Sequence, residues 1–266
     1  MKHLILSLII LLLASCTPKK QQLLILCTND SHSQIEAEND LGGFAARADL
    51  VDSLRKLYPL NLLLDAGDMV QGTPYFNVYH GRMEIAGYNR LGYDAATLGN
   101  HEFDMGLDTL AMFLKLADFP IVSCNYNVRG TALDGLVKPF AIFERGGMKI
   151  AVIGFGVSPK SLILKTNFDP IEYLNPIDMG NHYADSLKDA GAADFVIALS
   201  HLGHNTADRD NDSTLAANSR NIDLILGGHT HKVKGVFEIQ NLDNKPVKIV
   251  TTASKGLEMD KVVVEF

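Results

Sequence analysis

Cysteine is scarce in this chain of 266 residues, and an excess of basic charge is absent. The three cysteines are Cys16, near the start, and Cys27 and Cys124, within apolar runs. Two internal cysteines cannot make a disulfide framework, so we expect buried free thiols. Lys and Arg number 24 against 31 Asp and Glu, a formal net charge of -7. This balance argues against a broad nucleic-acid-binding face. It does not argue against small anionic substrates, because bound metal ions can supply positive charge.

A long apolar run is lacking at the N-terminus, where residues 4–13 follow Lys2 and precede Ala14, Ser15 and Cys16. A membrane-spanning helix needs about 20 residues, whereas a basic start, a short apolar core and small residues are typical of an export signal. Residues 13–16 (LASC) also resemble the bacterial lipobox. We therefore predict a lipoprotein signal peptide over residues 1–15, acylation of Cys16 and a polar tether over residues 16–22. The expected location is the bacterial cell envelope, facing the periplasm. An ordinary secretory signal with an incidental cysteine is the alternative.

Residues 23–266 contain no internal repeat, low-complexity segment or interdomain linker, and we predict one domain. Short apolar runs alternate with stretches of helical periodicity. The predicted strands are 23–27, 61–64, 95–98, 121–125, 195–199 and 222–226, and the predicted helices are 44–57, 82–91, 107–117 and 177–190. Residues 141–144 and 149–153 predict a hairpin, and 236–240, 248–252 and 261–266 predict mostly antiparallel strands. The alternation indicates an α/β fold with a mixed sheet, in which two sheets pack together.

Side chains that can bind metals follow five of these strands: Asp30 and His32, Asp68, Asn100 with His101, His201, and His229 with His231. Loops after strands are where α/β folds assemble their sites, so all five can converge on one cleft. One residue separates Asp30 from His32, and one separates His229 from His231, so each pair puts two ligands on one side of an extended segment. A single Asp or His in such a place is more often a turn former or a solvent-facing residue. The joint occurrence therefore carries the prediction.

The predicted ligands are oxygen and imidazole, without thiolate. That set disfavours a structural zinc site and suits a catalytic pair of divalent ions such as Mn, Zn, Fe, Co or Mg. Two ions roughly 3.5–4 Å apart form the standard clamp for in-line phosphoryl displacement. Asp68 can direct its two carboxylate oxygens at two ions, and Asn100 offers an amide oxygen.

Seven segments carry a resemblance to a known family. They are residues 29–32 (NDSH), 42–47 (GGFAAR), 65–68 with 71–74 (DAGD and QGTP), 92–94 (GYD), 99–106 (GNHEFDMG), 200–203 (SHLG) and 222–231 (IDLILGGHTH). In this order they resemble the calcineurin-like metallophosphoesterases and, within them, the catalytic domain of bacterial 5′-nucleotidases and UDP-sugar hydrolases. The resemblance implies a four-layer α-β-β-α sandwich of two mixed sheets flanked by helices, with residues 23–266 as the catalytic domain.

The resemblance also implies roles for residues. One metal would be held by Asp30, His32, Asp68 and His231, and the other by Asp68, Asn100, His201 and His229, so that Asp68 bridges. A metal-activated water would be the nucleophile. His101 would stabilise developing charge and protonate the leaving oxygen, and Asp104 would orient His101. A helix beginning at the Asn100 loop would put Asp104 about one turn from His101. An N-terminal helix cap is the alternative role for Asp104.

Two features depart from the family pattern. Ser33 stands where the family usually has glycine, which removes no ligand. Related nucleotidases continue into a second domain that binds the base and phosphates, whereas this sequence ends at Phe266. Arg47 and His204 are the nearby polar candidates for such binding, although we expect surface roles for both. A separately encoded C-terminal nucleotidase domain is a possible partner.

The expected function is a dinuclear metal-dependent phosphoester hydrolase, of the 5′-nucleotidase type, acting on small phosphorylated substrates in nucleotide catabolism. A phosphodiesterase or nucleotide-sugar pyrophosphatase is the alternative with the same metal pair. A non-catalytic binding lipoprotein that retains the fold is the alternative from another class.

Overall fold

The computed structural model describes residues 20–266. The predicted signal peptide and Cys16 lie outside these residues. Within them, no helix has both the length and the apolar character needed to cross a membrane.

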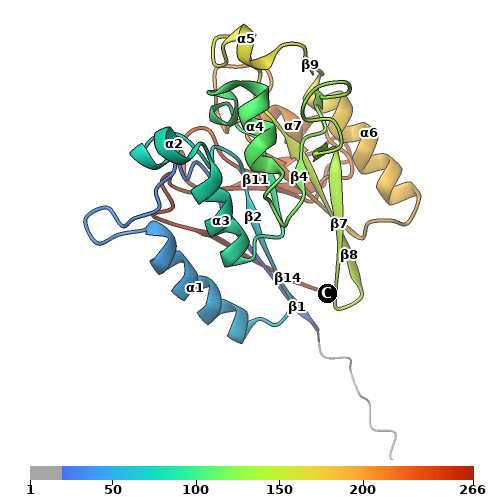
Figure 1. Cartoon of the computed structure of the whole chain (residues 1–266). Helices are drawn as coiled ribbons and strands as arrows, with labels where there is room; N and C mark the ends of the chain where they lie inside the picture. The colour runs from blue at the N-terminus through green and yellow to red at the C-terminus, as the bar shows by residue number, and fades with distance from the viewer. Residues whose placement is uncertain (1–19) are drawn as a thin grey trace, which may run out of the picture.

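Two six-stranded sheets form the centre of the described chain (Figure 1). The first has the order β14-β1-β2-β3-β4-β6, in which the strands from β1 to β6 run parallel and β14 is an antiparallel edge. Its strands are β14 (Asp260–Glu265), β1 (Gln22–Thr28), β2 (Asn61–Asp65), β3 (Ala95–Thr97), β4 (Ile121–Val122) and β6 (Val137–Lys138).

The second sheet has the order β12-β13-β11-β10-β8-β7, with antiparallel strands at both edges. Its strands are β12 (Gly235–Gln240), β13 (Pro246–Thr251), β11 (Leu224–Gly227), β10 (Phe195–Ser200), β8 (Met148–Phe155) and β7 (Phe140–Arg145). A small pair, β5 (Tyr126–Asn127) and β9 (Glu172–Tyr173), lies outside both sheets.

Helices cover the outer face of each sheet (Figure 1). The helices packed with the first sheet are α1 (Gly43–Leu57), α2 (Pro74–Tyr79), α3 (Arg82–Leu91) and α4 (Gly106–Leu114). Those packed with the second sheet are α6 (Pro176–Asp189) and α7 (Asp212–Ala217). The short α5 (Lys165–Phe168) and a 3₁₀ turn, η1 (His101–Phe103), lie in connections.

Alternation along the strands explains these layers. In β1, Leu23, Ile25 and Cys27 face the second sheet, whereas Leu24 and Leu26 pack against the helices. The same division occurs in β10, where Ile197 faces the first sheet and Ala198 faces α6 and α7. Because side chains alternate with a period of two, each sheet is buried on both faces. The predicted four-layer α-β-β-α sandwich is therefore confirmed.

The predicted helices 44–57, 82–91, 107–117 and 177–190 correspond to α1, α3, α4 and α6. The predicted hairpin is β7–β8, and Cys27 and Cys124 are buried free thiols, as expected. The strand predicted over 121–125 is only two residues long. Its continuation leaves the first sheet, since the Cys124 N–H donates to the Gly154 carbonyl in β8. The tail strands are antiparallel in β12–β13 and β14–β1, but β13 also runs parallel to β11.

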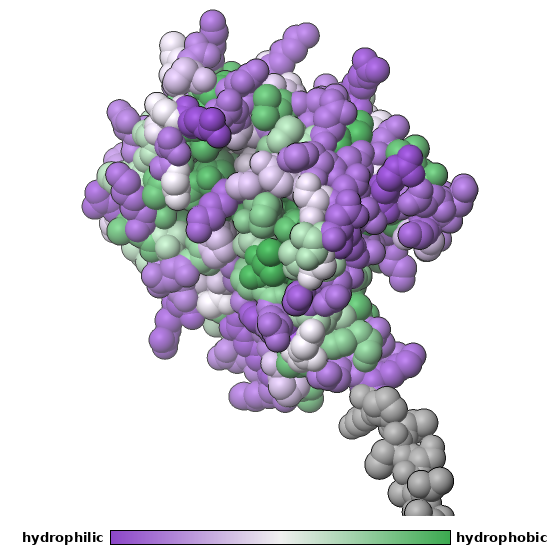
Figure 2. Space-filling model, turned by 90° about the vertical axis from the view of Figure 1, so that its right-hand side faces the viewer, coloured by the Kyte–Doolittle hydropathy of each residue, from purple (hydrophilic) through white to green (hydrophobic). Residues whose placement is uncertain are grey.

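Figure 2 shows one face of the molecule, on which most residues are hydrophilic and a group of hydrophobic residues lies near the middle. A small group of apolar side chains surrounded by polar ones is normal on the surface of a folded domain.

Candidate metal centre

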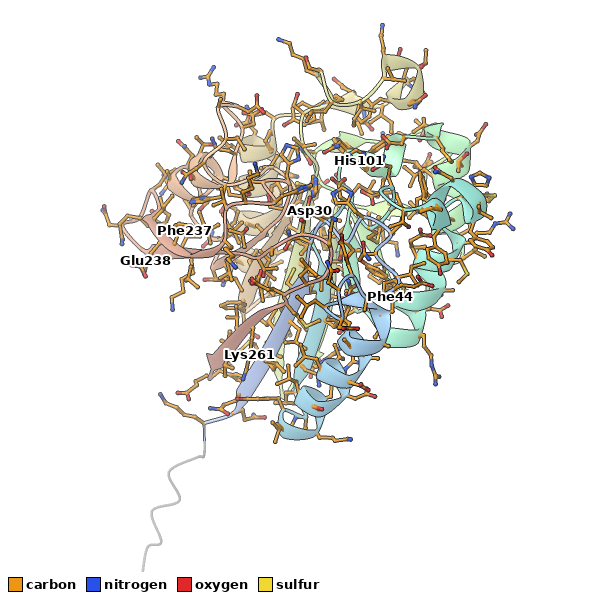
Figure 3. The ribbon with its side chains drawn as sticks, turned by 90° about the vertical axis from the view of Figure 1, so that its left-hand side faces the viewer. Asp30, Phe44, His101, Phe237, Glu238 and Lys261 are labelled. Atoms are coloured by element: carbon orange, nitrogen blue, oxygen red, sulfur yellow. The ribbon has the colours of Figure 1, made fainter. Side chains whose placement is uncertain are left out.

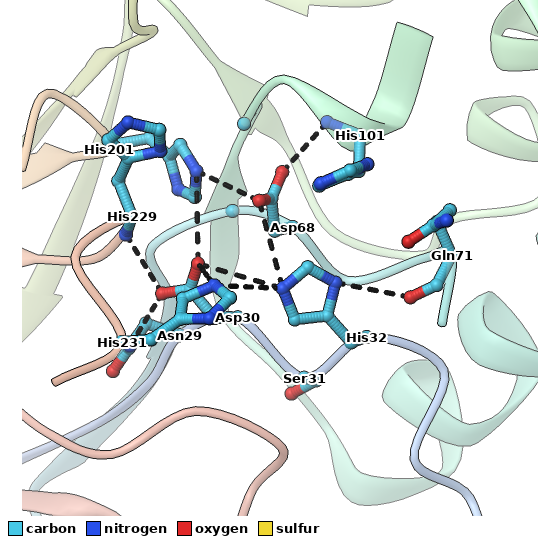
Figure 4. A network of polar contacts seen from close by, with 12 residues as sticks. Asn29, Asp30, Ser31, His32, Asp68, Gln71, His101, His201, His229 and His231 are labelled. Atoms are coloured by element: carbon cyan, nitrogen blue, oxygen red, sulfur yellow. Dashed lines mark hydrogen bonds and ion pairs between the residues drawn. The ribbon is translucent and has the colours of Figure 1, made fainter. Parts of the chain in front are cut away.

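The seven predicted ligands all follow strands at one end of the two sheets. Asp30 and His32 follow β1, Asp68 follows β2, Asn100 follows β3, His201 follows β10, and His229 and His231 follow β11. Figure 3 shows Asp30 and His101 between the N-terminal half and the C-terminal half, and Figure 4 shows the cluster at close range.

Two groups of possible ligands form in this cluster. Asp30, His32, Asp68 and His231 make one group, and Asp68, His201 and His229 make the other. In each group one ligand atom per residue lies within 4.8 Å of the others. Asp68 belongs to both groups, so its carboxylate lies where a bridging ligand is needed.

The ligand loops have a constrained backbone. Asp30, His32, Asp68 and His229 have φ values of 49°, 47°, 55° and 69°. Such left-handed conformations are unfavourable for residues with a Cβ and gather at functional sites. Ser33, in the place where the family usually has glycine, has a φ of 54°. Glycine adopts that conformation without a steric penalty, whereas Ser33 adopts it with its hydroxyl buried and without a hydrogen-bond partner in residues 20–266.

The first two loops remain paired after their strands end. The Asp30 N–H donates to the Gly67 carbonyl at 2.9 Å, and the His32 N–H donates to the Asp68 carbonyl at 3.0 Å. These bonds extend the β1–β2 pairing into the site and hold Asp30, His32 and Asp68 in fixed register.

Two histidines direct their Nε2 atoms to the centre, because a backbone carbonyl lies within hydrogen-bonding distance of each Nδ1. The Nδ1 of His32 lies 3.1 Å from the Gln71 carbonyl, and the Nδ1 of His201 lies 2.7 Å from the Ala66 carbonyl. In a neutral imidazole Nδ1 is then the donor, so each Nε2 carries a lone pair. The Nε2 of His32 is 3.0 Å from the Nε2 of His231, and the Nε2 of His201 is 3.2 Å from Asp68 Oδ2.

An imidazole nitrogen at such a distance from a second imidazole or a carboxylate shares either a proton or a bound cation with it. The buried Oδ1 of Asn100 also has no hydrogen-bond partner among the described residues, although such groups are normally paired. An amide oxygen, carboxylates and imidazoles suit divalent ions of the first transition row. The residues present therefore fit a pair of divalent metal ions.

The electrostatics agree with that fit. Burial alone lowers the pKa of His201, but the negative charges of Asp68 and Asp30 outweigh it and raise that pKa to about 10. Burial and the charge of His201 lower the pKa of His229 to about 4. Burial raises the pKa of Asp68, but the neighbouring His201 holds it well below its ordinary value. The pocket attracts positive charge strongly.

Gly99 and Gly228 keep the centre open. A Cβ at Gly99 would lie 2.7 Å from the Nε2 of His201 and still closer to Asp68 Oδ1. A Cβ at Gly228 would lie 3.1 Å from both Asp30 Oδ2 and the Nδ1 of His201. Larger side chains at these positions would press on the ligand atoms.

His101 and Asp104 form a pair beside Asp68. The Nδ1 of His101 is 2.8 Å from Asp104 Oδ2, and its backbone N–H donates to Asp68 Oδ1 at 2.9 Å. The hydrogen bond to Asp104 raises the pKa of His101. The His101 and His32 rings meet edge to face, with centroids 5.2 Å apart. Neither η1 nor α4 has a side-chain cap, so the alternative role of Asp104 as a helix cap is wrong.

Glu102 is a residue that the sequence prediction missed. Its buried Oε2 accepts from the Gly99 N–H at 2.6 Å and the Asp68 N–H at 3.1 Å, and its Oε1 accepts from the Met69 N–H at 2.8 Å. It thereby joins the loops after β2 and β3. Burial, followed by the charge of Asp68, raises its pKa to about 8. The sequence indication that was available for Glu102 is its position directly after the predicted site residue His101.

The surface roles expected for Arg47 and His204 are wrong. Arg47 is 4% exposed and His204 is 3% exposed. Arg47 lies one helical turn before Val51 on the buried face of α1. His204 packs on Phe237, with ring centroids 4.1 Å apart, and its Nδ1 is 3.1 Å from the Ser213 hydroxyl.

The fold and the centre together define a class of protein, an α/β sandwich that gathers two groups of possible metal ligands at the carboxyl ends of its strands. Residues 23–233 match the calcineurin-like phosphoesterase family model, and the chain belongs to this family.

The chain is similar to several known nucleotidases. It is 32% identical to a 5′-nucleotidase of Rattus norvegicus over 100% of this chain and 50% of the relative. It is 34% identical to the snake venom 5′-nucleotidase of Crotalus adamanteus over 79% of this chain and 37% of the relative. The structure of Haemophilus influenzae NAD nucleotidase superposes with a TM-score of 0.84 and 29% identity, over 93% of this chain and 48% of that one. The chain spans half or less of the length of each.

Proposed function

We propose that this chain is the catalytic part of a dinuclear metal-dependent phosphoester hydrolase, a phosphomonoesterase of the 5′-nucleotidase type. The observation that carries the proposal is the meeting of imidazole nitrogens and carboxylate oxygens at the centre, where His32 Nε2 and His231 Nε2 are 3.0 Å apart and Asp68 belongs to both groups of possible ligands. The His101–Asp104 pair lies beside them. Family membership and the nucleotidase relatives support the reaction class.

The predicted ligands fall into two groups, one for each ion. Asp30, His32, Asp68 and His231 would hold one ion, and Asp68, Asn100, His201 and His229 the other. When bound, two divalent ions neutralise phosphate charge and lower the pKa of water. The carbonyls of Gln71 and Ala66 fix the ring orientation of His32 and His201.

His101 would act on the substrate. Asp104 accepts the Nδ1–H bond, which leaves the Nε2 of His101 free to donate to a phosphate or leaving-group oxygen. Both side chains are 32% exposed, so the pair is accessible from solvent. A positioned acid of this kind accelerates cleavage of the P–O bond when the leaving oxygen needs a proton.

We extend the proposal to the N-terminal residues, of which 1–19 lie outside the described part of the chain. Residues 1–15 would be a lipoprotein signal, Cys16 its acylation site and residues 16–22 a tether, and residues 23–266 would be the catalytic domain in the cell envelope. The end of the tether joins the fold, because Gln22 begins β1 and the Gln21 N–H donates to the Phe266 carbonyl at 2.9 Å. A separate C-terminal nucleotidase domain would help select nucleotide substrates. The basis for the anchor is residues 13–16 (LASC). Mass spectrometry of the mature N-terminus tests it, and an unmodified or retained Cys16 peptide would refute acylation.

The activity itself is tested on chain stripped with a chelator and reloaded with Mn²⁺. An aryl phosphate, mononucleotides, a UDP-sugar and a cyclic nucleotide would be assayed in parallel, with and without any separate C-terminal-domain protein. We expect the monoesters to be hydrolysed, and His101→Ala to bind both ions but to lose most of the turnover. Preferential cleavage of the UDP-sugar or cyclic nucleotide would replace the phosphomonoesterase assignment. If wild type and His101→Ala were equally inactive with both ions bound, the enzyme proposal would fail.

A further inference from the structure

Arg47 places a buried charge beside the metal centre without touching any predicted ligand. Its guanidinium Cζ lies 5.1 Å from the Phe44 ring centroid and 5.9 Å from that of Tyr88. Gly256 closes the remaining side, because a Cβ there would collide with Nη2. Figure 3 shows Phe44 below and to the right of Asp30. A buried guanidinium remains protonated and needs a compensating negative charge.

That charge is Asp65, the last residue of β2, which is fully buried. One relay of hydroxyls joins the two groups. Arg47 Nη1 donates to the Tyr93 hydroxyl at 3.2 Å, the Tyr93 and Thr28 hydroxyls are 2.7 Å apart, and Thr28 Oγ1 donates to Asp65 Oδ2 at 2.6 Å. Since Thr28 gives its proton to the carboxylate, Tyr93 donates to Thr28.

A second relay joins the same charges through Ser31. Arg47 Nη2 donates to Ser31 Oγ at 3.2 Å, and the Tyr88 hydroxyl lies 3.0 Å from Ser31 Oγ and 2.8 Å from Asp65 Oδ2. A phenol has one proton. The Tyr88 hydroxyl can therefore donate to Ser31 Oγ or to Asp65 Oδ2, and it links Ser31, which accepts from Arg47, to the carboxylate of Asp65.

The two relays close a ring that holds both ligand loops. Ser31 stands between the predicted ligands Asp30 and His32. At the other end, Asp65 Oδ1 accepts from the Gly67 N–H at 2.9 Å, one residue before Asp68. The ring thus contacts the backbone segments that carry three of the four residues in one ligand group.

We propose that Arg47 is a positioning residue, and that its hydroxyl-bridged ion pair with Asp65 fixes the Asp30–His32 and Asp68 loops in their metal-binding geometry. This inference rests on the proposed function only for the metals at the site. Only a guanidinium can serve both relays, because it directs two nitrogens to two hydroxyls at once. A neutral side chain would leave Asp65 as an uncompensated buried charge.

The test is the Mn²⁺ affinity of the full chain, measured by calorimetry and by electron paramagnetic resonance, for wild type, Arg47→Met and Arg47→Lys. We expect Arg47→Met to weaken Mn²⁺ binding roughly 10–100-fold, the usual effect of removing groups that orient ligands. Arg47→Lys, which keeps the charge but reaches only one relay, should fall between.

Arg55→Met is the matched control. Arg55 is on the same helix and donates to the carbonyls of Leu91 and Gly92, away from the ligand loops. It should lower thermal stability and leave Mn²⁺ affinity unchanged. Ser31→Ala is the milder variant if Arg47→Met does not fold. We expect Ser31→Ala to weaken Mn²⁺ binding less than Arg47→Met, and the double variant to bind no more weakly than Arg47→Met alone.

Three results would overturn the inference. The first is a Mn²⁺ affinity that is unchanged in both Arg47→Met and Ser31→Ala. The others are equal losses of affinity in Arg47→Met and Arg55→Met, and a wild type that binds no Mn²⁺. Failure of the proposed function looks different. In that case the wild type would bind both ions and hydrolyse no phosphate ester, and the order of affinities among the variants would still hold.

Discussion

Glu102→Gln is the substitution for which the structure gives the clearest magnitude. The glutamate accepts three backbone N–H bonds with two oxygens. Glutamine has nearly the same shape and one acceptor oxygen. Its best orientation keeps that oxygen toward Asp68 and Gly99, so that the Met69 N–H faces an NH₂ group. One buried donor loses its acceptor, which costs about 1–3 kcal/mol.

In a domain of this size each 1 kcal/mol lowers the melting temperature by roughly 2–4 °C. We therefore expect Glu102→Gln to melt about 2–12 °C below wild type without metal, at a pH above about 8, where the carboxyl of Glu102 is ionised. Because Glu102 holds the Asp68 and Asn100 loops, metal affinity should also fall by roughly 10–100-fold. Glu172→Gln, at an exposed glutamate with one long hydrogen bond to Asn127, is the control and should change neither. Differential scanning calorimetry and Mn²⁺ titration make the measurement. Equal melting and equal affinity for Glu102→Gln and wild type would refute the reasoning.

Three further predictions follow from particular contacts. Gly99→Ala should weaken metal binding while the apo chain stays folded, because its Cβ would press on Asp68 and His201; wild-type affinity in a metal titration would contradict this. His101→Ala should lower kcat roughly 10²–10⁴-fold, and Asp104→Asn should lower it less. Steady-state kinetics in which Asp104→Asn has a lower kcat than His101→Ala would count against the orienting role. Burial, and then Glu258, raise the pKa of Asp260 to about 7, so the folded chain holds this proton more tightly than the unfolded chain. The stability that this proton contributes is fully present below about pH 4 and is lost as the pH rises through about 7. Chemical denaturation should therefore show wild type losing stability relative to Asp260→Asn between pH 5 and pH 8. If the free energies of unfolding of the two proteins changed in parallel with pH, the effect would be excluded.

The fold was predictable where periodicity is strong. The apolar run at residues 23–27 and the helical spacing at 44–57 each correspond to one element of the structure. Short elements escaped prediction, because α2 and α7 have six residues each and offer too little of a helical pattern. The early end of β4 depends on a contact with β8, which no local pattern encodes.

The predicted ligands converge because they follow strands that reach the same end of two sheets. Residues that act through the backbone were invisible to the same reasoning. Glu102 and Asp65 bind N–H groups of neighbouring loops, so their roles appear only when those loops are placed in space. Arg47 was misjudged for a related reason. A charged residue on a helix is normally exposed, whereas the hydrogen-bond partners that bury Arg47 are Tyr93 and Ser31, in the loops after α3 and β1.

The most direct test of the central claim is a parallel measurement of bound metal and phosphomonoesterase activity. Chain stripped of metal would be titrated with Mn²⁺, with bound ions counted by elemental analysis and aryl phosphate turnover followed at each point. We predict two ions per chain in wild type, activity that appears only as the second ion binds, and loss of both in Asp68→Asn. Full activity in stripped chain, or a wild type that binds two ions and shows no turnover above that of Asp68→Asn, would contradict the account.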